Sequence, residues 1–135
     1  MLEFTIKLRV RYGETDQMGY VYYGNYAEFY EVARVEMLRS LGLSYKEMEE
    51  SGIMLPVAEL HCKYLKPAKY DQEISIKVII DELPSVKINF KYELYNEDKE
   101  LINTGATTLV FVKMKTGRPC FPPKDFMDKL QSYFE

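Results

Sequence analysis

The sequence predicts an α+β domain in which one antiparallel sheet wraps around a long central helix. One strand, one long helix and four further strands follow each other along the chain, and this order places a helix on one side of a sheet. The strands alternate between polar and apolar residues, which is typical of sheets with one buried face. The length of 135 residues suits one domain, residues 1–135.

The first two elements are a strand and the central helix. Apolar residues alternate with polar ones from Phe4 to Val10, which is the period of a strand. Asn25 is the expected N-cap of the helix and Gly42 its expected end. Between them, apolar side chains recur at helical spacing at Tyr26, Phe29, Tyr30, Ala33, Met37 and Leu41.

The remaining elements are shorter. Residues 43–55 predict an amphipathic segment with a capping box at Ser44 and Glu47 and an end at Gly52. Strands are expected over residues 57–65, 73–80, 86–95 and 101–113, and a second helix over residues 124–134. The edge strands of such a sheet commonly pair across a twofold axis, so we expect a dimer or a dimer of dimers.

Composition and charge exclude several classes of protein. A formal net charge of −3 gives no broad basic field, which argues against nucleic acid as the main partner. No stretch approaches the roughly 18 apolar residues of a membrane helix, and the first ten residues lack a signal-peptide core. Cys62 and Cys120 have neither CxxC spacing nor the density of a disulfide scaffold. These features predict a globular protein of the cytoplasm.

The loop between the first strand and the helix carries the candidate chemistry. Asp16 lies there in a glycine-punctuated segment, shortly before the free amides expected at a helix N-terminus. Such amides can polarise a carbonyl oxygen held beside a carboxylate. Spacing alone favours a turn in which the Asp16 side chain accepts backbone N–H bonds.

A family resemblance favours a catalytic role for Asp16 over a role in the turn alone. It rests on Asp16, Gly19, Val21-Tyr22-Tyr23, Asn25-Tyr26 and Glu31-Val32-Ala33-Arg34. Together with Tyr64 to Asp71, these residues resemble the hotdog-fold acyl-CoA thioesterases, in particular the 4-hydroxybenzoyl-CoA thioesterase-like group, over nearly the whole chain. The related thioesterases of the Tol-Pal envelope system usually carry a histidine where this chain has Tyr23, so a role that needs imidazole there is excluded.

The resemblance implies a hotdog subunit that forms a dimer, frequently a tetramer, with two sites at the subunit interface. It implies hydrolysis of a fatty or aromatic acyl-CoA, with Asp16 as nucleophile or general base. It further implies that the Tyr23 backbone N–H polarises the thioester carbonyl. No metal or redox cofactor is implied, and coenzyme A enters only as part of the substrate.

Further residues are candidates for binding the substrate. Around Asp16, the expected binding residues are Gly19, Tyr20, Tyr22 and Asn25, because tyrosine rings suit an acyl pocket. The candidates for the phosphates of coenzyme A are Lys66, Lys69 and Arg118. Tyr26 and Tyr30 lie on the helical stripe and are expected in the core.

Glu31 and Arg34 are expected to support the site, either by orienting the loop or as an i,i+3 pair. Two alternatives to a thioesterase stay open. An acyl-thioester hydratase or dehydratase needs a histidine beside a carboxylate, whereas His61, the only histidine, has no partner at catalytic spacing and is expected to be structural or on the surface. A non-catalytic acyl-CoA binding protein is the second alternative.

Overall fold

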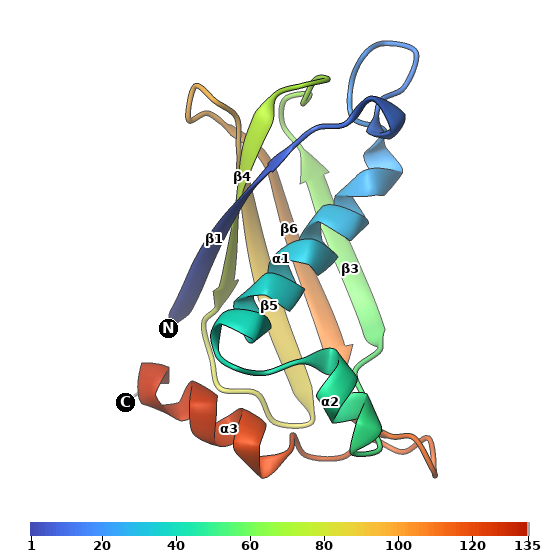
Figure 1. The fold of residues 1–135 in the computed structure, drawn as a ribbon, viewed down its shortest axis with the longest axis vertical. Coiled ribbons are helices and arrows are strands. Elements are labelled where there is room, and N and C mark those ends of the chain that lie inside the picture. The colour runs from blue at the N-terminus through green and yellow to red at the C-terminus, as the bar shows by residue number, and fades with distance from the viewer. Residues whose placement is uncertain (135) are drawn as a thin grey trace.

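A five-stranded antiparallel sheet forms one layer of the structure, and a long helix lies across its face (Figure 1). The computed structural model describes residues 1–134. The order of the strands in the sheet is β1-β4-β5-β6-β3. Their bounds are β1 Leu2–Arg9, β3 Val57–Tyr64, β4 Glu73–Ile80, β5 Lys87–Tyr95 and β6 Leu101–Val110.

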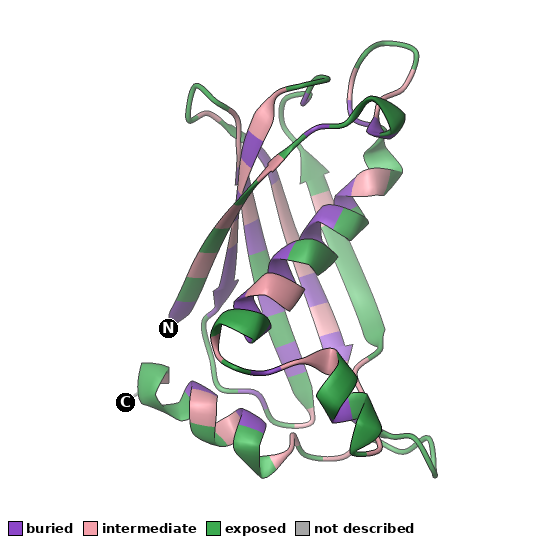
Figure 2. Ribbon diagram, in the orientation of Figure 1, coloured by how far each residue is buried: buried purple, intermediate pink, exposed green. Residues whose placement is uncertain are grey.

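The core lies between the sheet and helix α1 (Tyr26–Ser40). Figure 2 shows buried and exposed residues alternating along β5, as a period of two requires. The inward residues of β4 and β5 are almost wholly buried, and so is the predicted helical stripe from Tyr26 to Met37. The expected α+β architecture and the core positions of Tyr26 and Tyr30 are therefore confirmed.

Short elements close the ends of the sheet. They are the 3-10 turns η1 Tyr12–Glu14, η2 Tyr23–Asn25 and η3 Ser132–Phe134, the helices α2 Tyr45–Glu50 and α3 Lys124–Gln131, and a two-stranded ribbon of β2 Ile53–Met54 and β7 Val112–Lys113. The Glu47 backbone N–H donates to Ser44 Oγ at 3.0 Å, so the predicted N-cap of α2 is present. None of the helices within residues 1–134 is long and apolar enough to cross a membrane.

One predicted strand end was wrong, and at the N-cap position of α1, which is Asn25 as predicted, the side-chain cap is absent. The strand expected over residues 101–113 breaks at Phe111, whose side chain is fully buried and packs edge to face on Phe126, at 5.3 Å between ring centroids. After this break the chain pairs with β2 instead of continuing in the large sheet. Asn25 does not cap α1 with its side chain, because η2 leads directly into the helix and Asn25 already has helical backbone angles.

β3 forms an unprotected edge of the sheet. Within residues 1–134 it pairs only with β6, and each of its residues except Cys62 is exposed. The exposed residues include Val57, Leu60 and Tyr64, each at least 44% accessible. A flat edge with apolar side chains is a template for pairing with another strand.

Candidate active site

Glu14 holds the loop between β1 and α1 in place. Its carboxylate accepts the Arg11 backbone N–H at 2.7 Å and Arg11 Nη2 at 2.9 Å. Its carbonyl oxygen accepts the Tyr22 N–H at 2.9 Å and Asn25 Nδ2 at 2.8 Å. Burial by itself raises the pKa of the Glu14 carboxyl, but the hydrogen bonds from Arg11 outweigh this effect and hold the pKa below its usual value. The loop therefore closes on an ionised and nearly buried carboxylate.

Asp16 is anchored through one of its two carboxylate oxygens. Oδ1 accepts the backbone N–H groups of Met18, at 2.9 Å, and Tyr20, at 3.2 Å. Gly19, with φ of 79°, makes the turn between these two donors possible. Oδ2 takes part in no hydrogen bond within residues 1–134. The turn role that spacing favours is thus present, and it leaves the second oxygen available for chemistry.

The turn η2, which leads into α1, carries a free amide at Tyr23, and Tyr23 lines the same cleft as Asp16. The Tyr23 N–H makes no hydrogen bond within the described chain, as is usual for the first turn of a helix. The Tyr64 hydroxyl donates a hydrogen bond to the Tyr23 carbonyl oxygen at 3.2 Å. The Tyr64 ring packs edge to face on Tyr26, at 5.2 Å between centroids. The turn that carries the free amide is therefore tied to β3.

Asp16 and Tyr23 line one cleft of about 300 Å³. Its walls come from the loop, from the turn and first residue of α1, and from the end of β3 with the segment that follows it: Asp16, Met18, Tyr20, Val21, Tyr23, Tyr26, Tyr64, Leu65, Lys66 and Pro67. Most of this lining is apolar, and Asp16 and Lys66 are its two charged residues. A cleft of this kind suits an apolar ligand that carries one reactive polar group.

The structure brings some of the predicted binding residues to this cleft and leaves others outside it. Tyr20 and Lys66 line it, while Lys69 Nζ lies 6.0 Å from the centroid of the Tyr20 ring. Tyr22 is about half exposed, and its ring packs at a tilt of 42° against the Tyr23 ring instead of lining the cleft. The Asn25 side chain is engaged by the Glu14 carbonyl and so anchors the loop.

Arg118 lies at the other end of the subunit. It lines a separate cleft with Ile53 and Phe121, beside the ribbon of β2 and β7. In Figure 1 the orange hairpin that follows β6 lies at the lower end of the sheet, whereas the blue loop before α1 lies at the upper end. Within one subunit, Arg118 and Asp16 do not share a site.

The expected pair between Glu31 and Arg34 is wrong. Glu31 is exposed, whereas Arg34 is turned into the core and only 6% accessible. Arg34 Nη1 donates to the Tyr92 hydroxyl at 3.1 Å, and its guanidinium carbon lies 5.9 Å from the Phe90 ring centroid. Residues 1–134 place no carboxylate within ion-pair distance of Arg34. Residues three apart on a helix share a face only approximately. Here Arg34 packs against the sheet, whereas Glu31 faces solvent.

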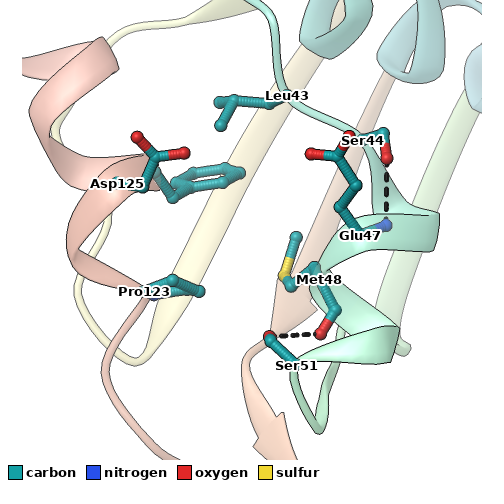
Figure 3. A pocket seen from close by; sticks show the side chains of 8 residues that line it. Leu43, Ser44, Glu47, Met48, Ser51, Pro123 and Asp125 are labelled. Atoms are coloured by element: carbon teal, nitrogen blue, oxygen red, sulfur yellow. Dashed lines mark hydrogen bonds between the residues drawn. The ribbon is translucent and has the colours of Figure 1, made fainter.

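Two other features lie away from the Asp16 cleft. The His61 side chain is 76% exposed and lies 3.7 Å from a Glu59 carboxylate oxygen, which confirms its place on the surface. A hollow of about 170 Å³ separates α2 from α3 (Figure 3). Glu47 and Asp125 stand on its rim, and the polar side chains of Ser44 and Ser51 are bonded within α2. Two carboxylates on the rim disfavour an anionic substrate there.

Of the cleft residues at the end of β3 and just after it, sequence reasoning named Lys66 for binding but gave Tyr64, Leu65 and Pro67 no role in the site. Tyr64, Leu65 and Pro67 reach the site because this segment pairs with the loop. The Val21 N–H donates to the Ala68 carbonyl at 2.8 Å, and an isolated bridge joins Tyr20 to Lys69. The turn residues Pro67 and Ala68 are the only local signal of this contact, and they do not name its partner.

Comparison with known proteins gives the family. The model of the thioesterase-like superfamily matches residues 10–130. YneP of Bacillus subtilis is 32% identical over 127 residues, which cover 94% of this chain and 92% of that protein. YbgC of Escherichia coli O157:H7, an acyl-CoA thioester hydrolase, is 29% identical over 124 residues and 92% of each chain. A DHNA-CoA thioesterase structure from Staphylococcus aureus has a TM-score of 0.86 and 36% identity, covering 99% of this chain and 85% of that one. The chain belongs to the thioesterase-like superfamily and has the predicted hotdog fold.

Proposed function

We propose that the protein hydrolyses the thioester of a small aliphatic or aromatic acyl-CoA in the Asp16 cleft, releasing the free acid and coenzyme A. The observation that supports this proposal is that Asp16 and Tyr23 line one largely apolar cleft, and that the Tyr23 backbone N–H has no acceptor within residues 1–134. Thioester hydrolysis needs a nucleophile or base and a donor for the developing oxyanion. These two groups supply both.

In the proposed reaction, the thioester carbonyl oxygen accepts a hydrogen bond from the Tyr23 N–H. Asp16 Oδ2 either attacks the carbonyl carbon or takes a proton from a water that attacks it. Attack by Asp16 forms a mixed anhydride as the carbon–sulfur bond breaks, and water then hydrolyses the anhydride. In both routes the thiolate leaves without a strong acid, because the pKa of a thiol is near 8.5.

The proposal is tested by thiol release from a panel of short, long and aromatic acyl-CoAs. Asp16→Asn keeps an oxygen that accepts from Met18 and Tyr20, so it should fold normally but lose activity by roughly 100-fold or more. Asp71→Asn is the matched control, since Asp71 is exposed and asparagine tolerates its φ of 68°. Full activity in folded Asp16→Asn would refute the assignment. If the unaltered protein hydrolyses none of the panel, the non-catalytic alternative holds.

An oxygen-18 experiment separates the two routes. In a single turnover in labelled water, attack by Asp16 followed by hydrolysis of the anhydride at the Asp16 carbonyl carbon gives an unlabelled product acid and leaves the label in Asp16, so label in Asp16 identifies this route. General-base catalysis puts the label in the product at once. Mass spectrometry of the product and of the peptide containing Asp16 reads out both fates.

The proposed assembly is a homodimer or homotetramer in which β3 pairs with β3 of a second copy. The exposed apolar edge of β3 supports this arrangement, and Tyr64 at its end lines the cleft. The proposed location is the cytoplasm, in keeping with the free thiols of Cys62 and Cys120. Size-exclusion chromatography with light scattering tests the assembly, and a monomer at micromolar concentration would contradict it.

A further inference from the structure

The outer face of β3 carries an acid, a histidine and a base at regular spacing. Cys62 and Tyr64 contact α1 and the turn before it, so the alternate residues Glu59, His61 and Lys63 point away from the helix. The side chains of Glu59 and His61 are 64% and 76% exposed. Lys63 is exposed and forms no ion pair within residues 1–134. These three side chains therefore line the open edge of the sheet, beyond β6 (Figure 1).

The backbone at this edge determines which residues of β3 can bond to another strand. The Leu65 N–H donates to the Ile102 carbonyl at 2.9 Å, so the backbone groups of alternate residues back to Glu59 also point towards β6. Between them, Leu60 and Cys62 direct their N–H and C=O groups to the open edge. A register shift just before Glu59 ends the regular stretch. A second strand can therefore pair regularly with β3 from Glu59 onwards.

One antiparallel register matches every charge on this face. If a twofold axis passes between two His61 residues, Glu59 of each copy lies opposite Lys63 of the other. Leu60 then lies opposite Cys62, and these two residues exchange hydrogen bonds through the groups that point to the open edge. An axis at Glu59 or at Lys63 sets like charges opposite each other, which is destabilising. An axis at Leu60 leaves Lys63 without an acid, and an axis at Cys62 sets His61 opposite Lys63.

The same pattern identifies the partner as a second copy of this chain. An acid and a base placed at equal distances from a central residue complement themselves when the strand is turned around. A parallel copy in register would instead set Glu59 opposite Glu59 and Lys63 opposite Lys63. The charge complementarity of the edge thus favours an antiparallel pair of identical strands.

We propose that β3 pairs with β3 of a second copy about a twofold axis at His61, and that protonation of the two facing histidines weakens this dimer in acid. The inference rests on the assembly in the proposed function and adds to it a register and a dependence on pH. Facing residues that do not bond to each other have Cα atoms about 4.5 Å apart, so the two imidazoles lie close together. Histidine gains a positive charge between pH 8 and pH 5, and two facing imidazolium groups repel each other.

The charges around His61 leave the second histidine as the one that decides the effect. In its own chain, a Glu59 carboxylate oxygen lies 3.7 Å from Nε2, the facing residues of β6 are uncharged, and Lys91 lies one strand further away. In the second copy, Glu59 and Lys63 flank the histidine on either side and offset each other. Its own Glu59 is present in monomer and dimer alike, whereas the second histidine is near only in the dimer. The dimer is therefore more stable above the range in which histidine titrates and is weakened as the pH falls through it.

Charge reversal tests the two ion pairs. Glu59→Lys and Lys63→Glu each create two like-charged pairs across the interface, so each should raise the Kd of the dimer tenfold or more at pH 8 and low salt. Glu59→Lys/Lys63→Glu restores both pairs with exchanged signs, and its Kd should return to within about threefold of the original. The two positions lie roughly 13 Å apart within one strand, at about 3.3 Å per residue, so this rescue cannot arise inside a subunit.

Sedimentation over a dilution series measures these Kd values, and native mass spectrometry of subunit exchange measures dissociation where it is slow. The control is Lys87→Glu, which reverses an exposed lysine on β5 that forms no ion pair in the described chain and should leave the Kd unchanged. Single reversals without effect, or a double variant that is not rescued, refute the proposed pairs.

Disulfide formation locates the axis. In a Cys62→Ala/Cys120→Ala background, His61→Cys places two thiols at the axis, where a Cα separation of about 4.5 Å permits a disulfide. Mild oxidation should convert most of this protein to a covalent dimer. Lys63→Cys in the same background should stay unlinked, because its two thiols lie roughly 13 Å apart along the strands. Faster linkage of Leu60→Cys than of His61→Cys would move the axis and refute the register.

A pH series tests the histidine pair. The Kd of the unaltered dimer should rise about tenfold or more from pH 8 to pH 5.5, whereas that of His61→Gln, which cannot gain a charge, should change less than about twofold. An equal rise in both proteins, or no rise in the unaltered one, refutes the role of His61. None of these measurements requires turnover, so they decide the inference even if no acyl-CoA is hydrolysed. A dimer that responds to none of the changes leaves the proposed assembly standing and overturns the inference.

Discussion

The Tyr64 hydroxyl donates a hydrogen bond of 3.2 Å to the Tyr23 carbonyl oxygen, which ties the end of β3 to the turn that opens α1. The two rings also meet edge to face, with centroids 6.4 Å apart. Tyr23 supplies the free amide proposed to hold the oxyanion, so this bond holds the turn that carries that amide. Tyr64 is a positioning residue, because it acts on the reaction through Tyr23.

Tyr64→Phe tests that role by removing the hydroxyl and keeping the ring. One hydrogen bond of about 0.5–1.5 kcal/mol corresponds to a fall of roughly 2- to 13-fold in kcat. KM should change little, since the ring still walls the cleft. Tyr133→Phe removes a tyrosine hydroxyl outside the cleft and is the control. A Tyr64→Phe variant with unchanged kcat and raised KM would show that the hydroxyl binds substrate instead.

The hydrogen bonds from Arg11 to the Glu14 carboxylate predict that part of the free energy of unfolding is lost at acidic pH. Hydrogen bonds from Arg11 lower the pKa of Glu14 in the folded protein despite burial, so the ionised form stabilises the fold. This contribution is fully present above the unfolded pKa of about 4.3, and it is lost as pH falls through the lower folded pKa. Glu14→Gln should therefore be less stable than the unaltered protein by about 1 kcal/mol at pH 7.

The difference in unfolding free energy between Glu14→Gln and the unaltered protein should narrow as the pH is lowered from 5 towards 3. Urea unfolding at several pH values measures it, with Glu97→Gln on the exposed β5–β6 turn as the control. A gap that stays constant down to pH 3 would show that Glu14 acts through its shape and not through its charge.

Gly105 of β6 leaves room for the Tyr30 ring. A Cβ at position 105 would overlap the Tyr30 hydroxyl and ring, which are fully buried and stack on Tyr92 with centroids 4.2 Å apart. Tyr30 cannot move easily, because its hydroxyl also bonds to the Asn103 side chain. Gly105→Ala should lower the free energy of unfolding by about 1–3 kcal/mol or more, as overpacking does.

Gly13→Ala is the matched control, since nothing lies within 4 Å of a Cβ there. Adding Tyr30→Leu to Gly105→Ala should make the double variant more stable than the sum of the single effects, because the leucine frees the space. Strict additivity in thermal or urea unfolding would contradict the predicted overlap.

Arg34 is a buried cation whose named partners are neutral. Its Nε has no hydrogen-bond partner within residues 1–134, and Tyr92 keeps a second bond to Thr107 Oγ1 at 2.6 Å without it. Arg34→Met preserves the packing volume and removes the desolvated charge, so its unfolding free energy should stay within about 1.5 kcal/mol of the original or rise. Arg34→Ala leaves a cavity and should cost about 2–4 kcal/mol. Equal losses in both variants would show that the guanidinium itself is required.

Local pattern alone is enough to predict most of the elements. The alternation in β4 and β5 and the stripe on α1 identify their buried faces, because each period has a single geometry. Asp16 and the start of the helix lie in one short stretch of chain, so their proximity could be predicted locally. The family resemblance singled out that stretch. The family and the hotdog fold follow from it and are confirmed.

Contacts between distant segments decided the rest. Arg34 donates a hydrogen bond to Tyr92 instead of pairing with Glu31. Phe111 lies outside the large sheet and packs on Phe126, and Tyr64 bonds to Tyr23, 41 residues away in the chain. Local spacing says which side of an element a residue occupies, but not which segment packs on that side. Those choices depend on filling one shared core and on pairing buried polar groups, and both conditions are set only when the whole chain is assembled.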